Sequence, residues 1–304
     1  MTMSPLMAKA QPGLYEEPGN SAHYLECHWP KNTPVDKLKA GLLDALKPVV
    51  GAYIAVGFGI DAWVRMQPDF VPEELASFPL LKGKHGYEMP STQTDIWFWI
   101  HGEDRGDVMN AVLQVQQSLR GMLDVHLDLA GFKNREARDL TGFVDGTAND
   151  KDEARGLAAQ IPEGELGAGG SYVLTQKWKH NLTAFNELSV SEQEYVIGRT
   201  KHDNIEMSDD QMPNDSHVSR TDVDVDGVAQ KIYRRSTPYG GAQDHGLYCL
   251  AFACSLSRIH VQLERMLGLT DDGLSDSLMQ FSQAKTGSYW FMPAQKDLEE
   301  ILAS

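Results

Sequence analysis

Cysteine and basic residues are both scarce in this chain of 304 residues. It contains only Cys27, Cys249 and Cys254, and no Cys-x-x-Cys pair, so neither a disulfide framework nor a zinc cluster is indicated. Lysine and arginine number 27 against 43 acidic residues, which gives a formal net charge of -16. Such a charge argues against nucleic acids and anionic membranes as partners.

Long apolar runs are missing as well. No segment reaches the roughly 18 apolar residues that a membrane-spanning helix needs. Residues 1–20 contain a single lysine and no apolar run, so we expect neither a secretory signal nor a twin-arginine leader. The scarcity of cysteine fits a reducing compartment, and the cytoplasm is the expected location.

Hydrophobic periodicity predicts an alternation of strands and helices in the first part of the chain. Strands are expected over residues 22–28, 53–58, 95–101 and 123–129. Thr33 as N-cap and Pro34 at the first helical position announce one helix, and Asp107 is expected to cap a second. The resulting order is strand, helix, two strands, helix, strand.

A looser copy of the same order follows. Strands are expected over residues 172–179, 231–235, 247–253 and 288–291, with a helix over 191–198 and another capped by Ser257. The duplicated order predicts an α+β protein of two ferredoxin-like halves with antiparallel sheets, residues 1–135 and 136–304. Residues 148–170 and 203–227 are expected to form long loops.

An acidic stretch in the second of these loops suggests a metal site. Asp222-x-Asp224-x-Asp226-Gly227 resembles the start of an EF-hand calcium loop, but position twelve, which should be a glutamate, is Tyr233. A solvated acidic turn is the interpretation that we favour over calcium binding.

The most informative motif is Gly142-Phe143-Val144-Asp145-Gly146-Thr147. Glycines on both sides of an acid let the backbone adopt conformations closed to other residues and approach a flat ligand closely. Asp-Gly is also among the commonest turn dipeptides, so the motif alone more often marks a solvated turn. Further along, strand alternation would place Arg234 and Ser236 on one face and Arg235 on the other.

Taken together, several motifs resemble the dye-decolourising peroxidases, a haem peroxidase family with a Gly-x-x-Asp-Gly signature, and specifically its shorter bacterial members. The resemblance covers about the last 170 residues strongly, through Gly142–Thr147, Ser216–Thr221, Tyr233–Gly240, Gly246-Leu247 and Lys285–Phe291. It implies a fold like that of the dimeric α+β barrels and a haem b cofactor held mainly by the second half.

The resemblance also implies roles for individual residues. His217 matches the proximal iron ligand, and Asp276 matches its hydrogen-bonded carboxylate, although Asp276 could equally cap a helix. Asp145, Arg234 and Ser236 match the residues that act on peroxide. Arg199 and Arg220 are candidates to pair with the haem propionates, or could form ordinary surface ion pairs.

The activity implied is reduction of hydrogen peroxide with oxidation of dyes, phenols or other bulky reductants. Two other hypotheses stay open: a haem-handling protein for iron release or porphyrinogen oxidation, and a non-enzymatic haem- or anion-binding module. The resemblance further implies a homo-oligomer of two or more copies.

Overall fold

The computed structural model describes residues 4–17 and 19–304. The first half contains strands β1 (Ser21–His28), β2 (Ala52–Phe58), β5 (Ile96–Gly102) and β6 (Asp124–Phe132), the short β3 (Leu81–Lys82) and β4 (Glu88–Met89), and helices α1 (Val35–Ala45), α2 (Ile60–Met66) and α3 (Arg105–Ser118). The second half contains strands β7 (Ser171–His180), β10 (Tyr233–Arg234), β11 (Thr237–Gly240), β12 (His245–Ala253), β13 (Ser282–Ala284) and β14 (Ser288–Met292). Its helices are α4 (Asp152–Ala159), α5 (Leu182–Glu187), α6 (Val190–Ile197), α7 (His217–Thr221), α8 (Leu256–Met266) and α9 (Gln295–Ala303).

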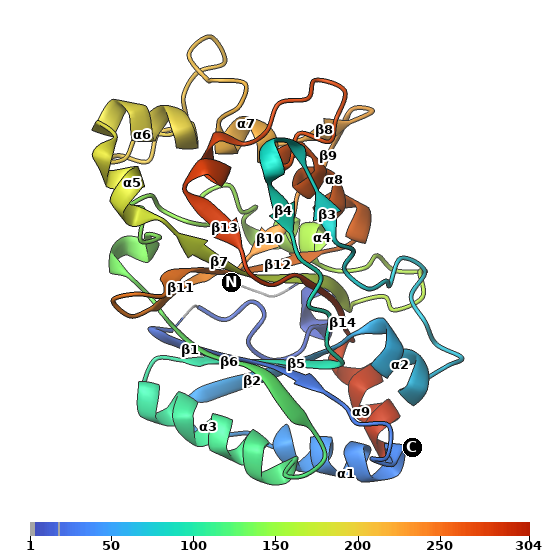
Figure 1. Cartoon of the computed structure of the whole chain (residues 1–304). Helices are drawn as coiled ribbons and strands as arrows, with labels where there is room; N and C mark the ends of the chain where they lie inside the picture. Colours follow the sequence, from blue (N-terminus) through green and yellow to red (C-terminus); the bar gives the residue numbers. More distant parts are fainter. Residues whose placement is uncertain (1–3, 18) are drawn as a thin grey trace.

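The main strands form two antiparallel sheets that join at both edges. The first has the order β6-β1-β5-β2, and the second runs β14-β7-β12-β11. A pair between Phe58 and Phe291 joins β2 to β14, and a pair between Gly131 and Tyr239 joins β6 to β11. The sheets therefore close on one another, with α1 and α3 outside the first sheet (Figure 1). The predicted α+β class with antiparallel sheets is confirmed, while the boundary between residues 135 and 136 stays a prediction.

Both faces of β5 are buried, and its alternating side chains belong to two different cores. Ile96, Phe98 and Ile100 belong to the core between this sheet and its helices. Trp97 and Trp99 point the other way, into the space between the two sheets, where Trp97 lies stacked near Trp290. The interior between the sheets is thus filled mainly by aromatic side chains.

One carboxyl group lies in this aromatic interior. Glu26 of β1 is fully buried, and its Oε1 accepts hydrogen bonds from the Tyr248 hydroxyl at 2.8 Å and the Thr175 hydroxyl at 3.0 Å. Its Oε2 has no partner among the described residues. Burial raises the pKa of Glu26 from 4.5 to about 7, so the folded protein favours the protonated acid.

A Glu26→Gln variant is expected to lose the part of the pH dependence of stability that this acid creates. Because the pKa is higher in the folded state, wild-type stability should fall as pH rises from 4.5 through 7. The shift corresponds to about 3 kcal/mol. Glutamine mimics the neutral acid, so at pH 8 the variant should be the more stable protein, and at pH 4.5 the two should be similar.

Calorimetric melting temperatures across this pH range test the expectation. Glu187→Gln, at an exposed position of α5, is the matched control. Parallel pH profiles for wild type and Glu26→Gln would show that Glu26 is not protonated on folding.

Three predicted helix starts are wrong by one to three residues. Pro34, not Thr33, is the N-cap of α1, because the Thr33 hydroxyl instead donates to the carbonyl of Met122. Asp104, not Asp107, caps α3 and accepts from the first backbone amides of that helix. For α8 the N-cap is Ser255, and the amide of Ser257 donates to Glu74 from a distant segment.

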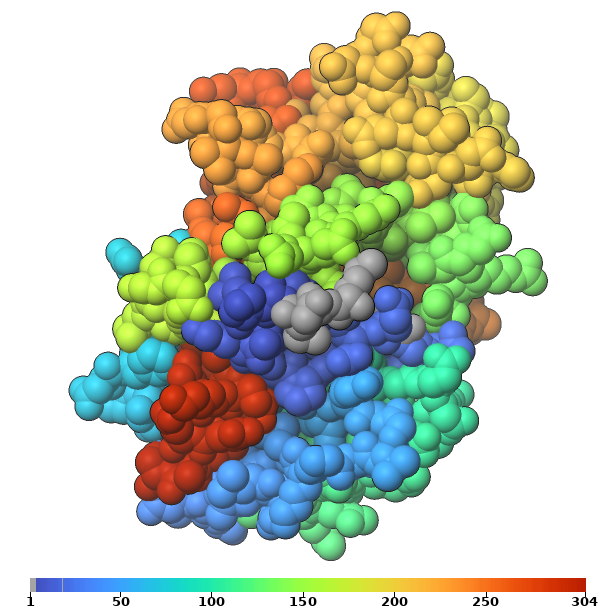
Figure 2. Space-filling model, turned by 180° about the vertical axis from the view of Figure 1, so that it is seen from behind, coloured from blue at the N-terminus to red at the C-terminus, as the bar shows by residue number. Residues whose placement is uncertain are grey.

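The predicted loops are more ordered than expected. The segment 148–170 contains α4, which lies beside the N-terminal segment, as the view from behind shows (Figure 2). A hydrogen bond from the Gln160 amide to the carbonyl of Leu6 ties the two segments together. The segment 203–227 contains α7, which carries His217, and the strand 231–235 shortens to β10.

The acidic stretch after α7 is a hairpin. Strands β8 (Asp224–Val225) and β9 (Val228–Ala229) pair across Asp226 and Gly227, which both have positive φ values, and the Asp222 carboxylate pairs with Lys231. No cluster of three or more His, Cys, Asp or Glu side chains suited to a metal ion occurs in the described part of the chain. The favoured interpretation, an acidic turn, agrees with this geometry. Within the same residues, no helix has both the length and the apolar character to cross a membrane.

Candidate active site

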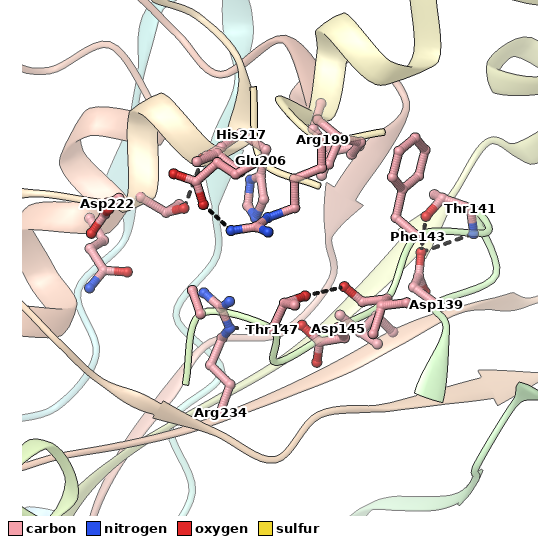
Figure 3. A pocket seen from close by; sticks show the side chains of 18 of the residues that line it. Asp139, Thr141, Phe143, Asp145, Thr147, Arg199, Glu206, His217, Asp222 and Arg234 are labelled. Atoms are coloured by element: carbon pink, nitrogen blue, oxygen red, sulfur yellow. Dashed lines mark hydrogen bonds and ion pairs between the residues drawn. The ribbon is translucent and has the colours of Figure 1, made fainter. Parts of the chain in front are cut away.

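Two adjoining cavities lie between the second sheet and helices α7 and α8. They comprise about 980 Å³ and 760 Å³ of space not filled by atoms, part of it open to solvent, and share lining residues that include His217, Asp145 and Arg234. Figure 3 shows His217 and Arg199 on one side of the cavity, with Asp145 and Arg234 facing them from the other.

His217 is the first residue of α7, and a carboxylate beside Nδ1 holds its ring in place. The Ser216 hydroxyl caps the helix by accepting from the amide of Ser219. Nδ1 of His217 lies 2.7 Å from Oδ2 of Asp276, whose side chain is completely buried. A carboxylate at Nδ1 favours the tautomer with the proton on that nitrogen. The lone pair of Nε2 is then free to bind a metal.

Asp276 forms both of the contacts that the sequence left open. While Oδ2 contacts His217, Oδ1 accepts a hydrogen bond of 2.8 Å from the amide of Leu278 and so caps the 3-10 turn Ser277–Gln280. The cap fixes the position of the carboxylate, and the carboxylate in turn orients the imidazole.

On the opposite wall, Asp145 lies in the glycine-flanked turn. Gly142 and Gly146 have φ values of 93° and 73°, which L-residues with a side chain rarely adopt, so both glycines are needed for this loop. The amide of Asp145 donates to the carbonyl of Ala137 and holds the acid in place.

Arg234 comes from β10 and lies beside Asp145. Its Nε is 3.7 Å from Oδ1 of Asp145, beyond hydrogen-bond length, and this buried nitrogen has no hydrogen-bond partner among the described residues. Arg234 and Ser236 line the second of these cavities and Arg235 lines neither, although all three side chains line a third hollow beside them.

The two predicted propionate partners lie in different places. Arg199 lines the cavity and forms an ion pair with Glu206. Arg220 is 1 % exposed and donates to the Asp272 carboxylate at 2.6 and 3.1 Å, outside the cavity lining. The side chain of Arg220 is committed to packing α7 onto the segment after α8, so this geometry contradicts its assignment as a propionate partner.

Sequence reasoning missed two parts of the site. The Asn149 amide group donates to the carbonyl of Arg234 at 2.8 Å and accepts from its amide at 2.9 Å, which ties β10 to the Asp145 loop. His180 lines both cavities, with Nε2 3.1 Å from Asp139 and Nδ1 2.8 Å from Ser282. Burial opposes ionisation of Asp139, but its contacts with His180 and Thr141 hold its pKa below the ordinary value.

Relatives of the chain are known by sequence and by structure. It is 35% identical over 258 residues to a dye-decolorizing peroxidase of Rhodococcus erythropolis, which covers 83% of this chain and 75% of the relative. A dye-decolorizing peroxidase of Mycobacterium tuberculosis is 33% identical over 272 residues, covering 84% and 81%. The solved dye-decolorizing protein of V. cholerae matches with a TM-score of 0.84 at 34% identity, over 97% and 98% of the two chains.

Another similar structure is a variant of DypB from Rhodococcus jostii RHA1 in complex with haem. It superposes with a TM-score of 0.88 at 29% identity, over 97% of this chain and 99% of that one. Residues 22–133 match the model of the Dyp-type peroxidase N-terminal domain, and residues 136–297 match the C-terminal one. With a histidine facing an acid and an arginine across one cavity, and with relatives along nearly its full length, the chain belongs to the Dyp-type peroxidase family.

Proposed function

We infer that the cavity between His217 and the pair Asp145–Arg234 holds haem b, and that the chain uses it to reduce hydrogen peroxide while oxidising a dye, a phenol or another bulky reductant. The observation that carries this proposal is the arrangement itself. An imidazole with an available Nε2, held by a buried carboxylate, faces an acid and a cation across one cavity.

The residues present fit this cofactor. His217 offers the neutral imidazole nitrogen that haem iron binds, and Asp276 makes that imidazole a stronger electron donor. The unpartnered Nε of Arg234 points to a missing acceptor in the cavity. Arg199 is the propionate partner that we propose, although it would have to share its charge with Glu206. Bound haem would supply an iron centre that binds peroxide and accepts its oxidising equivalents.

The chain's own residues handle the proton and the charge. Peroxide cleaves heterolytically when a proton moves from its inner to its outer oxygen, and we assign this transfer to Asp145. Arg234 carries a permanent charge and would stabilise the negative charge that develops on the departing oxygen. Asn149 positions Arg234 through its backbone, and Ser236 adds a hydroxyl to the same wall.

Turnover by the haem-loaded protein tests the proposal. Oxidation of a dye should require both peroxide and haem. A haem-handling protein would instead release iron or oxidise porphyrinogen without peroxide-dependent dye oxidation. Binding of haem without any turnover would favour the non-enzymatic module. A cytoplasmic location and a homo-oligomer remain proposals from composition and family resemblance.

Asp276→Asn is expected to weaken haem binding by about 10- to 100-fold, the usual cost of losing such a supporting carboxylate. An asparagine oxygen cannot both cap Leu278 and accept from Nδ1 of His217. If the cap is kept, the amide group of the new residue faces Nδ1 and forces the proton onto Nε2, which then cannot bind iron.

The rate of haem transfer to a scavenger protein measures this effect. Asp215→Asn is a matched control, because Asp215 accepts from Ser277 of the same turn without touching the imidazole. Equal transfer rates for Asp276→Asn and wild type would reject the proposed role of Asp276.

Surface charge should affect anionic reductants. A net charge of -16 repels sulfonated dyes at neutral pH, and salt screens such repulsion. Added salt at pH 7 should therefore raise kcat/KM for an anionic dye and leave the reaction with neutral peroxide nearly unchanged. If the anionic dye does not respond to salt, long-range repulsion is not what limits its oxidation.

A further inference from the structure

A third hollow adjoins the Asp145–Arg234 wall and reaches the interior between the two sheets. It comprises about 1800 Å³ of space not filled by atoms, part of it open to solvent. Trp99 and His101 of β5, Arg155 of α4 and Arg235 after β10 line it, and Asp145 and Arg234 line both this hollow and the cavity of His217. We call it the Arg235 chamber.

Several buried donors of this chamber lack an acceptor. Nε1 of Trp99, Nε of Arg155, Nε of Arg234 and Nη2 of Arg235 are buried without a hydrogen-bond partner among the described residues. Buried donors nearly always have a partner, and leaving one unmade costs about 1–3 kcal/mol. Nε of Arg234 also adjoins the cavity of His217, but the other three donors belong to side chains that line this hollow and neither of the two cavities, and they indicate an acceptor bound here.

The charge of Arg235 points to an anion. Arg235 is 8 % exposed, donates through Nη1 to the carbonyl of Leu14, and lies over the ring of Trp99 at 5.0 Å. It forms no ion pair with any described carboxylate, and neither does Arg155. Arg220, the other deeply buried arginine, has a carboxylate in Asp272.

The positive charge of Arg235 also acts on the neighbouring His101. Burial and then the charge of Arg235 lower the pKa of His101 to about 3, so His101 is neutral. Its Nε2 lies 3.1 Å from the carbonyl of Gly13 and must donate to it. The other nitrogen, Nδ1, is then an unpartnered acceptor on the chamber wall. The carboxylates of the lining, which are Glu17, Asp145, Asp150 and Asp152, do not pair with Arg235.

We propose that the Arg235 chamber binds a small aromatic carboxylate as the reductant of the proposed peroxidase. A guanidinium matches a carboxylate geometrically, with two parallel hydrogen bonds. Trp99 and Tyr233 supply aromatic walls for a ring, and Nδ1 of His101 can accept from a hydroxyl. The chamber therefore attracts locally the class of anion that the net charge of -16 repels from the surface.

Oxidation of a phenolic carboxylate by hydrogen peroxide balances in atoms and electrons. This step rests on the proposed peroxidase function. Each of two phenols loses one electron and one proton. The O–O bond of one peroxide breaks, and the two electrons and two protons convert it to two molecules of water. Two phenoxyl radicals leave the chamber.

Calorimetric titration of the haem-loaded protein with benzoate, which cannot be oxidised in this way, tests binding alone. We expect one benzoate per chain, no binding of benzyl alcohol, and an unchanged Soret band. Arg235→Met should weaken benzoate binding by about 10-fold or more, the scale of a lost hydrogen bond to a charged group. Arg155→Met changes a separate element and should also weaken benzoate binding. It therefore tests the chamber even if Arg235→Met does not fold.

Arg65→Met is the matched control. Arg65 likewise lies over a tryptophan, Trp29, and donates to backbone carbonyls, but it is outside the chamber. In turnover, Arg235→Met should raise KM for 4-hydroxybenzoate with kcat nearly unchanged. It should leave KM for 4-hydroxybenzyl alcohol as in wild type.

The chamber proposal is overturned if benzoate does not bind, or if the Arg235 and Arg155 variants bind it as tightly as wild type. A Soret shift that places benzoate at the iron would overturn it as well. Turnover of 4-hydroxybenzyl alcohol reports separately on the proposed peroxidase. If this neutral phenol is oxidised while benzoate does not bind, only the chamber proposal fails. If no phenol is oxidised, the peroxidase proposal fails, whatever benzoate does.

Discussion

His217→Ala is expected to yield protein that retains little or no haem, because the substitution removes the proposed iron ligand. The cavity has no second histidine able to replace it: the two nitrogens of His180 are already within hydrogen-bond distance of Asp139 and Ser282. Loss of the imidazole also leaves Oδ2 of the buried Asp276 without its hydrogen-bond partner, which destabilises the site further.

The haem-to-protein ratio and the Soret band measure the effect. His202→Ala is the control, since His202 is an exposed histidine directly before the segment 203–227 and its side chain pairs with Asp203. A His217→Gly variant should regain haem and a Soret band when imidazole is added. Full occupancy and an unchanged spectrum in His217→Ala would reject the assignment.

Arg234→Leu is expected to slow the reaction with peroxide by at least about 10²-fold, the scale on which single electrostatic donors act. The fold should be little affected, because the backbone bonds between Arg234 and Asn149 do not depend on the side chain. The loss should appear in the step that consumes peroxide and not in haem content.

Stopped-flow mixing with peroxide measures this rate, with Arg258→Leu as a control outside the cavity lining. Asp145→Asn should slow the same step, and by less if water can relay the proton. A larger loss at Arg234 than at Asp145 would show that charge stabilisation dominates. Unaltered kinetics in Arg234→Leu would reject its role.

Local patterns predicted part of the geometry of the candidate site. Gly142 and Gly146 on either side of Asp145 have positive φ values, and Arg234 and Ser236 line one cavity together, although Ser236 lies between β10 and β11. Helix starts were less predictable. The carboxylate that holds the start of α8 belongs to Glu74, from a distant part of the chain.

What the sequence could not predict depends on contacts between distant segments. Nothing local distinguishes Arg220, which binds Asp272, from Arg199, which lines the cavity. Asn149 reads as an ordinary loop residue until β10 is placed beside it.

Closure of the two sheets has a consequence for synthesis of the chain. Phe58 of β2 pairs with Phe291, close to the end of the chain, and Trp97 of β5 finds Trp290 there. During translation the first sheet is therefore complete long before β14 leaves the ribosome. Its edge strand and aromatic face stay uncovered in that interval, the condition under which nascent chains associate wrongly. Chaperone demand should consequently end only when the last strand has been made.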